Sequence, residues 1–199
     1  MVAELPAAPQ SHRWTDVRHW RVGVRRALIA RRLAMDGGLR RTRSERAKAQ
    51  LLANAELGRF TTLGVYWPVR GEIDVRDLAI GHLGNGGRIG LPVVVTESAP
   101  VEFWSWRPET PMSRGVWNIP IPAERELLEP DALIVPLVGF DPQRYRLGYG
   151  GGYYDRTLAA CRRRPFCIGL GYEEAQLATI FPQPHDIPMD LIVTDGGRL

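Results

Sequence analysis

Lysine, cysteine and long apolar runs are scarce or missing in this sequence. Among its 199 residues the one lysine is Lys48, and the two cysteines, Cys161 and Cys167, do not form a C-x-x-C pair. The lack of a Gly-Lys-Ser/Thr sequence excludes a P-loop, and the cysteines are too few for a disulfide framework or a zinc site. No apolar run is long enough to cross a bilayer, and the start lacks the charged-then-apolar order of a signal peptide. We therefore expect a reduced, cytoplasmic protein with no membrane partner.

Arginine, by contrast, carries nearly all of the positive charge, and much of it falls within residues 13–46. Such a basic first quarter could be a nucleic-acid patch, or a solvated helical face combined with an anion site. The net charge is only +4, and acidic residues are spread through the remainder. This balance favours the second interpretation and argues against a nucleic-acid partner.

The hydrophobic pattern predicts alternating strands and helices. Helices are expected at 16–35, 44–57, 74–83 and 153–163, with Gly58 as the C-cap of the second and a short further helix at 173–180. Strands are expected at 61–67, 88–95, 101–106, 132–140, 166–172 and 191–194. Residues 1–12, rich in proline and alanine, are expected to be disordered, which leaves a domain at 13–199. This order predicts a single-domain α/β fold, with a mostly parallel sheet flanked by helices in a Rossmann-like layered architecture.

The stretch from Arg146 to Arg156 contains four glycines within five positions. A glycine loop between the apolar run 132–140 and a helix lets backbone N–H groups approach an anion at the helix N-terminus. The two arginines could neutralise phosphate charge, and Asp155 could hold Mg²⁺. Tyr153 stands where a dinucleotide fingerprint needs its third small residue, so that motif is excluded. The alternative is a glycine-rich surface turn, which does not require the adjacent arginines, tyrosines and aspartate.

Five further residues each allow two interpretations. Arg21 and Arg25, four apart, project from one helical face that suits either a polyphosphate or solvent. Glu72, at a strand-to-helix connection, is either a ligand-contacting carboxylate or a residue favoured by the helix dipole. Trp117 is either a packing anchor or a stacking surface. Asp186 is either a second metal carboxylate or a turn residue.

Together these pieces resemble the 5-formyltetrahydrofolate cyclo-ligase family, also called 5,10-methenyltetrahydrofolate synthetases. The stretches 134–141 and 146–156 are similar to the family signature, and 71–74, 117–120 and 185–186 match further pieces in the family's order. The resemblance implies ATP-dependent cyclisation of 5-formyltetrahydrofolate to 5,10-methenyltetrahydrofolate through phosphorylation of the formyl oxygen. It also implies Mg²⁺ as cofactor, and ATP and a reduced folate as small-molecule partners. We expect the protein to be a monomer.

The resemblance also implies site residues. ATP contacts fall on Arg21, Arg25, Arg146, Leu147, Gly148, Tyr149, Gly150, Gly151, Gly152, Tyr153 and Tyr154. Folate contacts fall on Trp67, Glu72, Trp117, Tyr149, Gly150, Gly151, Gly152 and Tyr153. Catalytic roles fall on Arg146, Tyr153 and Asp155, and Mg²⁺ on Asp155 and Asp186.

The sequence departs from the family at two of these positions. Arg21 stands where the family typically has lysine, and Tyr149 where it often has a basic or small residue. The competing hypothesis is a diverged, non-catalytic nucleotide- or RNA-binding regulatory protein. Such a protein would need neither Asp155 nor Glu72, and its binding would fall steeply with salt.

Overall fold

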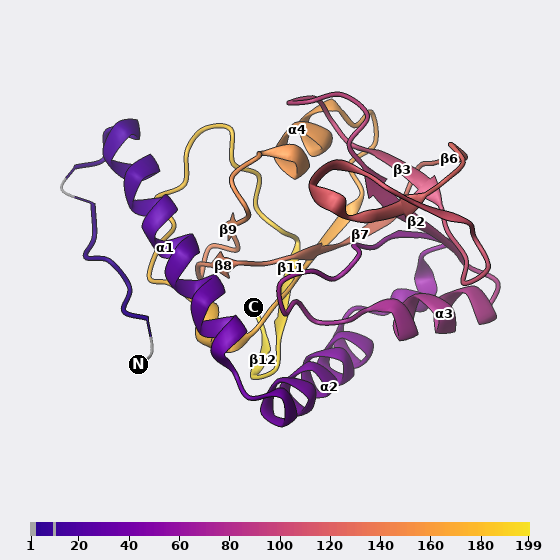
Figure 1. Cartoon of the computed structure of the whole chain (residues 1–199), viewed down its shortest axis with the longest axis horizontal. Helices are drawn as coiled ribbons and strands as arrows, with labels where there is room; N and C mark the ends of the chain where they lie inside the picture. Colours follow the sequence, from indigo (N-terminus) through magenta and orange to yellow (C-terminus); the bar gives the residue numbers. More distant parts are fainter. Residues whose placement is uncertain (1–2, 10) are drawn as a thin grey trace.

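An eight-stranded sheet lies at the centre of the computed structural model, which describes residues 3–9 and 11–199 (Figure 1). The strand order is β12-β11-β10-β7-β1-β2-β3-β6. Strands β11, β10, β7, β1 and β2 run parallel, whereas β12 at one edge and β3 and β6 at the other are antiparallel to their neighbours. The expected α/β fold with a mostly parallel sheet is therefore confirmed.

The strands of the main sheet are β1 (Thr62–Gly64), β2 (Arg88–Val93), β3 (Glu102–Ser105), β6 (Leu127–Leu128), β7 (Ala132–Pro136), β10 (Phe166–Leu170), β11 (Leu191–Thr194) and β12 (Gly197–Arg198). Two hairpins pair β4 (Met112–Arg114) with β5 (Pro120–Pro122) and β8 (Gly139–Phe140) with β9 (Arg146–Leu147). The α-helices are α1 (Trp14–Ala34), α2 (Gly37–Asn54), α3 (Arg76–Gly84) and α4 (Tyr153–Ala160). Single 3₁₀ turns occupy Leu57–Arg59, Val116–Asn118 and Glu173–Ala175.

Side chains of β7 alternate between two hydrophobic cores, one on each face of the sheet. Ala132 and Ile134 belong to the core that α2 and α3 cover, whereas Leu133 and Val135 belong to the core that α1 and α4 cover. Because successive residues of a strand point to opposite faces, a strand covered on both sides is apolar throughout. The result is a three-layer sandwich of helices, sheet and helices.

The second helix starts earlier and ends earlier than expected. The Asp36 carboxylate accepts hydrogen bonds from the N–H groups of Gly38 (2.8 Å) and Leu39 (3.1 Å). This N-cap starts α2 at Gly37 and so incorporates the two glycines into the helix. The prediction of Gly58 as its C-cap was wrong, since Ala55 ends α2 and Gly58 lies in the following 3₁₀ turn.

The helix expected at 173–180 is only a 3₁₀ turn. Its later backbone N–H groups are bonded across the fold instead, from Leu177 to the Phe140 carbonyl (2.8 Å) and from Ile180 to the Asp141 carboxylate (3.0 Å). The strand expected at 132–140 is likewise interrupted after Pro136, because proline has no N–H to extend the ladder, and the chain resumes as β8.

The N-terminal segment expected to be disordered, residues 1–12, includes residues 1, 2 and 10, which lie outside the described part of the chain. Residues 3–9 have no regular secondary structure. The Ala3 carbonyl accepts a hydrogen bond from Arg31 Nε at 2.5 Å, so this segment runs beside α1. Among the described residues, no helix is long and apolar enough to span a membrane.

Candidate active site

The glycine loop, residues 148–152, connects β9 to α4. Two of its glycines have backbone angles that other residues rarely adopt, with φ of +97° at Gly150 and +66° at Gly152. A Cβ atom at Gly150 would also lie 3.2 Å from Arg25 Cζ. The backbone conformation at position 150 therefore favours glycine, and a Cβ atom there would also crowd the Arg25 guanidinium.

The N-terminus of α4 is open to an anion. Gly152 is its N-cap and supplies no side-chain acceptor. Within residues 3–9 and 11–199, no hydrogen-bond acceptor is found for the backbone N–H groups from Tyr149 to Asp155. Free N–H groups and the helix dipole together favour a bound anion, as the sequence predicts.

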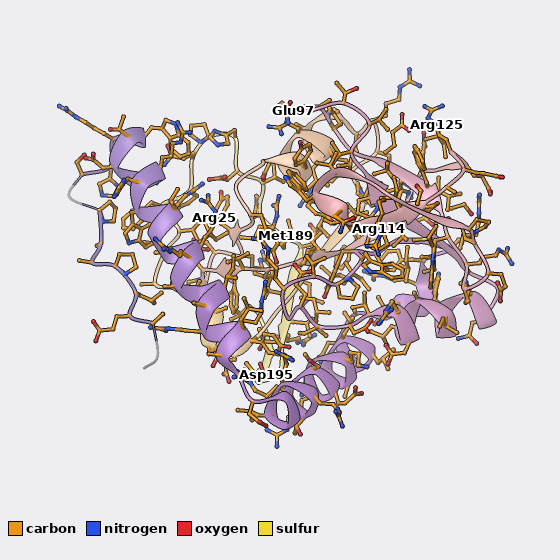
Figure 2. The ribbon with its side chains drawn as sticks, in the orientation of Figure 1. Arg25, Glu97, Arg114, Arg125, Met189 and Asp195 are labelled. Carbon is orange, nitrogen blue, oxygen red and sulfur yellow. The ribbon has the colours of Figure 1, made fainter. Side chains whose placement is uncertain are left out.

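Arg25 faces this loop from α1. Its Nε donates to the Gly148 carbonyl at 2.7 Å, and Figure 2 shows the residue on the inner side of the helix. Burial and the neighbouring charge of Arg21 lower the pKa of Arg25. A guanidinium that is desolvated and repelled in this way gains from a bound anion.

Arg21, one turn earlier on the same helical face, is engaged elsewhere. It is buried and pairs with Asp186 at 2.6 Å, and it donates to the carbonyls of Ile180 (3.0 Å) and Phe181 (3.1 Å). Burial works to raise the pKa of Asp186, but hydrogen bonds from Arg21 and the Gln183 N–H together lower it. Arg21 therefore holds the segment 180–186 against α1.

Arg146 and Asp155 form a second ion pair at 2.9 Å, and both side chains are largely buried. The other oxygen of Asp155 accepts the Ile187 N–H at 3.1 Å, and Arg146 donates to the Ile187 carbonyl at 3.2 Å. Ile187 directly follows Asp186, so the structure brings both predicted metal carboxylates to one short segment. No group of three or more His, Cys, Asp or Glu side chains suited to a metal occurs among the described residues.

Glu72 contacts the glycine loop directly. Its Oε1 accepts from the Tyr149 hydroxyl at 2.7 Å and its Oε2 from the Val69 N–H at 2.8 Å. Burial raises the pKa of Glu72, and these hydrogen bonds, with the charges of Arg32 and Arg70, offset only part of that effect. A desolvated carboxylate in such a position is typical of a binding or catalytic site.

The two tryptophans predicted to contact the folate, Trp117 and Trp67, lie in different surroundings. Trp117 is 66% exposed, and its ring meets the Tyr153 ring edge-on, with centroids 5.6 Å apart. Its φ of 57° is unusual for a non-glycine residue. Trp67 is partly buried and packs instead against Trp106, with centroids 6.3 Å apart. Trp117 therefore borders the glycine loop, whereas the Trp67 ring packs on the core and lies beneath the Arg76 guanidinium.

Arg32 was missed by the sequence reasoning. It is buried, and its Nη2 donates to the Tyr149 hydroxyl at 2.6 Å. The signal was present, because Arg21, Arg25 and Arg32 follow one another at spacings of four and seven on α1. That spacing places all three on one helical face.

A cavity of about 290 Å³ lies elsewhere, between α3 and the β2–β3 edge of the sheet. It is lined by residues such as Leu83, Arg88 and Trp106 and includes none of the predicted site residues. The chemistry-bearing side chains thus gather around the glycine loop and not around this cavity.

Known proteins resemble the chain in both sequence and fold. Residues 17–195 match the 5-formyltetrahydrofolate cyclo-ligase family. The 5-formyltetrahydrofolate cyclo-ligase of Mycolicibacterium smegmatis is 30% identical over 180 residues, which covers 86% of this chain and 91% of the relative. That of Haemophilus influenzae is 32% identical over 139 residues, covering 66% and 74%. The structure of Aquifex aeolicus 5,10-methenyltetrahydrofolate synthetase superposes with a TM-score of 0.77 at 27% identity, covering 89% of this chain and 91% of that one.

Proposed function

This chain belongs to the 5-formyltetrahydrofolate cyclo-ligase family, and we propose that it converts 5-formyltetrahydrofolate to 5,10-methenyltetrahydrofolate in an ATP-dependent reaction. The observation that carries the proposal is the meeting of two sites at one loop. Free N–H groups and Arg25 offer a binding site for phosphate, and the Tyr149 hydroxyl of the same loop donates to the half-buried carboxylate of Glu72. An anion site and an acceptor site are thereby joined, as a reaction between a nucleotide and a folate requires.

The proposed reaction needs an anion site and a folate site but no dedicated acid–base pair. A formamide carbonyl is a poor electrophile, and its oxygen is a poor leaving group. Transfer of the γ-phosphoryl group of ATP to that oxygen releases ADP and gives an imidate phosphate. The neighbouring secondary nitrogen of the folate then attacks the activated carbon, loses its proton, and expels the oxygen as phosphate. Phosphoryl transfer depends on positioning and charge neutralisation more than on an acid–base pair.

We assign the phosphates of ATP to the glycine loop and the first turn of α4. The free N–H groups from Tyr149 to Asp155 would bind the phosphate oxygens, and Arg25 would neutralise charge beside Gly148. Arg146, whose guanidinium lies over the Tyr154 ring in the first turn of α4, is already oriented by its hydrogen bonds to Asp155 and the Ile187 carbonyl. Preorganised donors of this kind stabilise charge that develops in a transition state.

We assign the folate to the side of the loop that carries Glu72 and Trp117. An ionised carboxylate only accepts hydrogen bonds, so Glu72 suits the N–H donors of a pterin edge. The exposed face of Trp117, next to Tyr153, offers a flat surface for an aromatic ring. Trp67 would support this side through its packing on Trp106.

We propose that Asp155 and Asp186 would hold a magnesium ion whose coordination the substrate completes. Mg²⁺ is commonly bound by one or two carboxylates together with substrate phosphates and water, not by an all-protein cage. Asp155 accepts the N–H of Ile187, the residue after Asp186. Each carboxylate is paired with an arginine, Asp155 with Arg146 and Asp186 with Arg21, so a bound ion would share these carboxylates with the arginines or replace them. When bound, the ion would neutralise charge on the transferring phosphoryl group.

A non-catalytic nucleotide- or RNA-binding role is not favoured. The arginines of the first quarter that are buried face inward: Arg21 pairs with Asp186, and Arg32 bonds to Tyr149. Arg43 pairs with both Asp195 and Glu174. Part of the basic stretch is therefore committed to contacts within the fold and is not available to a polyanion.

The test is a spectroscopic assay of methenyltetrahydrofolate formation from 5-formyltetrahydrofolate, with and without Mg-ATP. We expect product only when ATP is present. Protein that binds ATP but forms no methenyl product would refute the substrate assignment. The cytoplasmic location and the monomeric state expected from the sequence stay predictions, which cell fractionation and analytical ultracentrifugation can check.

A further inference from the structure

We propose that Arg32 and Tyr149 form a hydrogen-bond relay that fixes the Glu72 carboxylate, so that the glycine loop and this carboxylate are positioned as one unit. The identity of the ligand that meets Glu72 rests on the proposed function. The relay itself rests on contacts between α1, the glycine loop and the turn after β1. Arg32 and Tyr149 act in it as positioning residues.

The chemistry of the three groups sets the direction of the relay. A guanidinium only donates hydrogen bonds, so Arg32 Nη2 must donate to the Tyr149 oxygen, at 2.6 Å. The single hydroxyl proton of Tyr149 is then free to point at the Glu72 Oε1 atom, 2.7 Å away. An ionised carboxylate only accepts, which completes the sequence from donor to acceptor.

The relay occupies some of the hydrogen-bond acceptor positions of the Glu72 carboxylate and leaves others for a ligand. Its Oε1 is tethered by Tyr149, and its Oε2 by the Val69 N–H at 2.8 Å. A carboxylate has about four acceptor positions, so roughly two remain for a ligand. A carboxylate held at both oxygens suits a ligand that presents adjacent N–H donors, as the aminopyrimidinone edge of a reduced pterin does.

Arg32 is suited to hold this arrangement because it is anchored by three separate segments. It is 5% exposed, and besides Tyr149 it donates to the carbonyls of Arg70 (2.9 Å) and Leu137 (3.1 Å). Leu137 directly follows β7, and Arg70 lies in the turn just before Glu72. One buried side chain thereby links the end of the central strand, the Glu72 turn and the glycine loop.

The charges around Glu72 make the relay measurable. Arg32 from α1, Arg70 from the turn and the Tyr149 hydroxyl favour the ionised carboxylate, whereas the tyrosines Tyr66 and Tyr154 are uncharged neighbours in the ordinary pH range. Burial raises the pKa of Glu72, and the hydrogen bond from Tyr149 opposes that rise. Removing this hydroxyl must therefore raise the pKa of Glu72 further.

The test uses Tyr149→Phe, which keeps the ring that packs near Arg70 and removes only the hydroxyl. The carboxyl carbons of glutamate are followed by ¹³C NMR against pH, and Glu72→Gln identifies the Glu72 signal by its loss. We expect the midpoint for Glu72 to move upward by about half a pH unit or more in Tyr149→Phe. The acid limb of kcat/KM for 5-formyltetrahydrofolate should move with it, since this limb reports groups of the free enzyme.

Tyr145→Phe is the matched control, because the described part of the chain offers its hydroxyl no hydrogen-bond partner, and it should leave both midpoints in place. An unchanged Glu72 midpoint in Tyr149→Phe overturns the relay, even if the parent protein is fully active. A parent protein that forms no methenyl product overturns the proposed function instead, while a shifted midpoint still establishes the relay. The two proposals can thus fail separately.

Discussion

The most informative single substitution is Asp155→Asn. In the structure Asp155 accepts a hydrogen bond from Arg146 at 2.9 Å through one oxygen and from the Ile187 N–H at 3.1 Å through the other. Asparagine keeps one acceptor oxygen but turns an NH₂ group toward the second donor. We therefore expect a loss of about 1.5–3 kcal/mol in the free energy of unfolding, the usual size of a hydrogen bond to a charged group. For a chain of this length, that corresponds to a fall in Tm of roughly 3–12 °C.

A purely structural role of Asp155 would stop at that loss of stability. If Asp155 also binds Mg²⁺, its amide replacement gives the ion a weaker ligand, and phosphoryl transfer loses charge neutralisation. Several kcal/mol in the barrier correspond to a fall in kcat of about a hundredfold or more. Turnover should be measured across a range of Mg²⁺ concentrations, at a temperature well below the Tm of the variant.

The matched control is Asp131→Asn. Asp131 precedes β7 at the amino edge of the sheet, away from the glycine loop, and its carboxylate accepts the N–H groups of Thr61 (3.2 Å) and Thr62 (3.0 Å). This variant should also lose stability but keep its turnover. If Asp155→Asn keeps near-parental turnover with an unchanged Mg²⁺ dependence, Asp155 holds Arg146 in place and our metal site is wrong.

Three further predictions concern the loop and one surface ion pair. Arg25→Ala should weaken ATP about tenfold or more while changing folate affinity little, because Arg25 reaches the loop through Gly148; titrations with each ligand decide this. Gly150→Ala should cost about 1–3 kcal/mol of stability, measured by denaturant unfolding, since its φ is +97°; an unchanged midpoint would contradict the strained conformation. Hydrogen bonds from Arg125 and the Trp104 indole lower the pKa of Glu102 to about 2. The stability from this pair should be complete above pH 4.5, the ordinary value. It should be lost as the pH falls toward about 2, and it should be small because Arg125 is exposed and solvent screens the pair. In Arg125→Ala the pH midpoint of the Trp104 indole N–H resonance should rise.

Much of the fold could be predicted because its strongest patterns are local. The uniformly apolar β7 and the periodic α1 were found close to their true positions, and the glycine loop was placed between a strand and a helix. Local patterns failed where distant groups compete for the backbone. The segment 173–180 has helix-forming residues, but Phe140 and Asp141 bind its N–H groups, so only one 3₁₀ turn forms.

The site shows the same division between local and long-range information. The spacing of Arg21 and Arg25 predicts that they share a helical face, and they do, but it does not reveal that Asp186 pairs with Arg21 while Arg25 reaches the loop. Tyr149 and Glu72 are far apart in the sequence, so no spacing rule joins them. β1 and β7 are parallel neighbours, so the segments that follow them leave the sheet at the same edge. One segment contains the Glu72 turn and the other the β8–β9 hairpin with the glycine loop, which allows the hydrogen bond between Tyr149 and Glu72.

The position of α1 has a consequence for biosynthesis. This helix leaves the ribosome before the strands that it covers, because its core is built from β7, β8 and β10, in the second half of the sequence. Until those strands emerge, Val24 and Leu28 have no surface on which to be buried. A nascent chain therefore carries an uncovered apolar face until these strands emerge, and chaperones bind such surfaces while aggregation begins from them. The arginines on the same helix place charges within that apolar face, which reduces its continuous hydrophobic surface before the strands are synthesised.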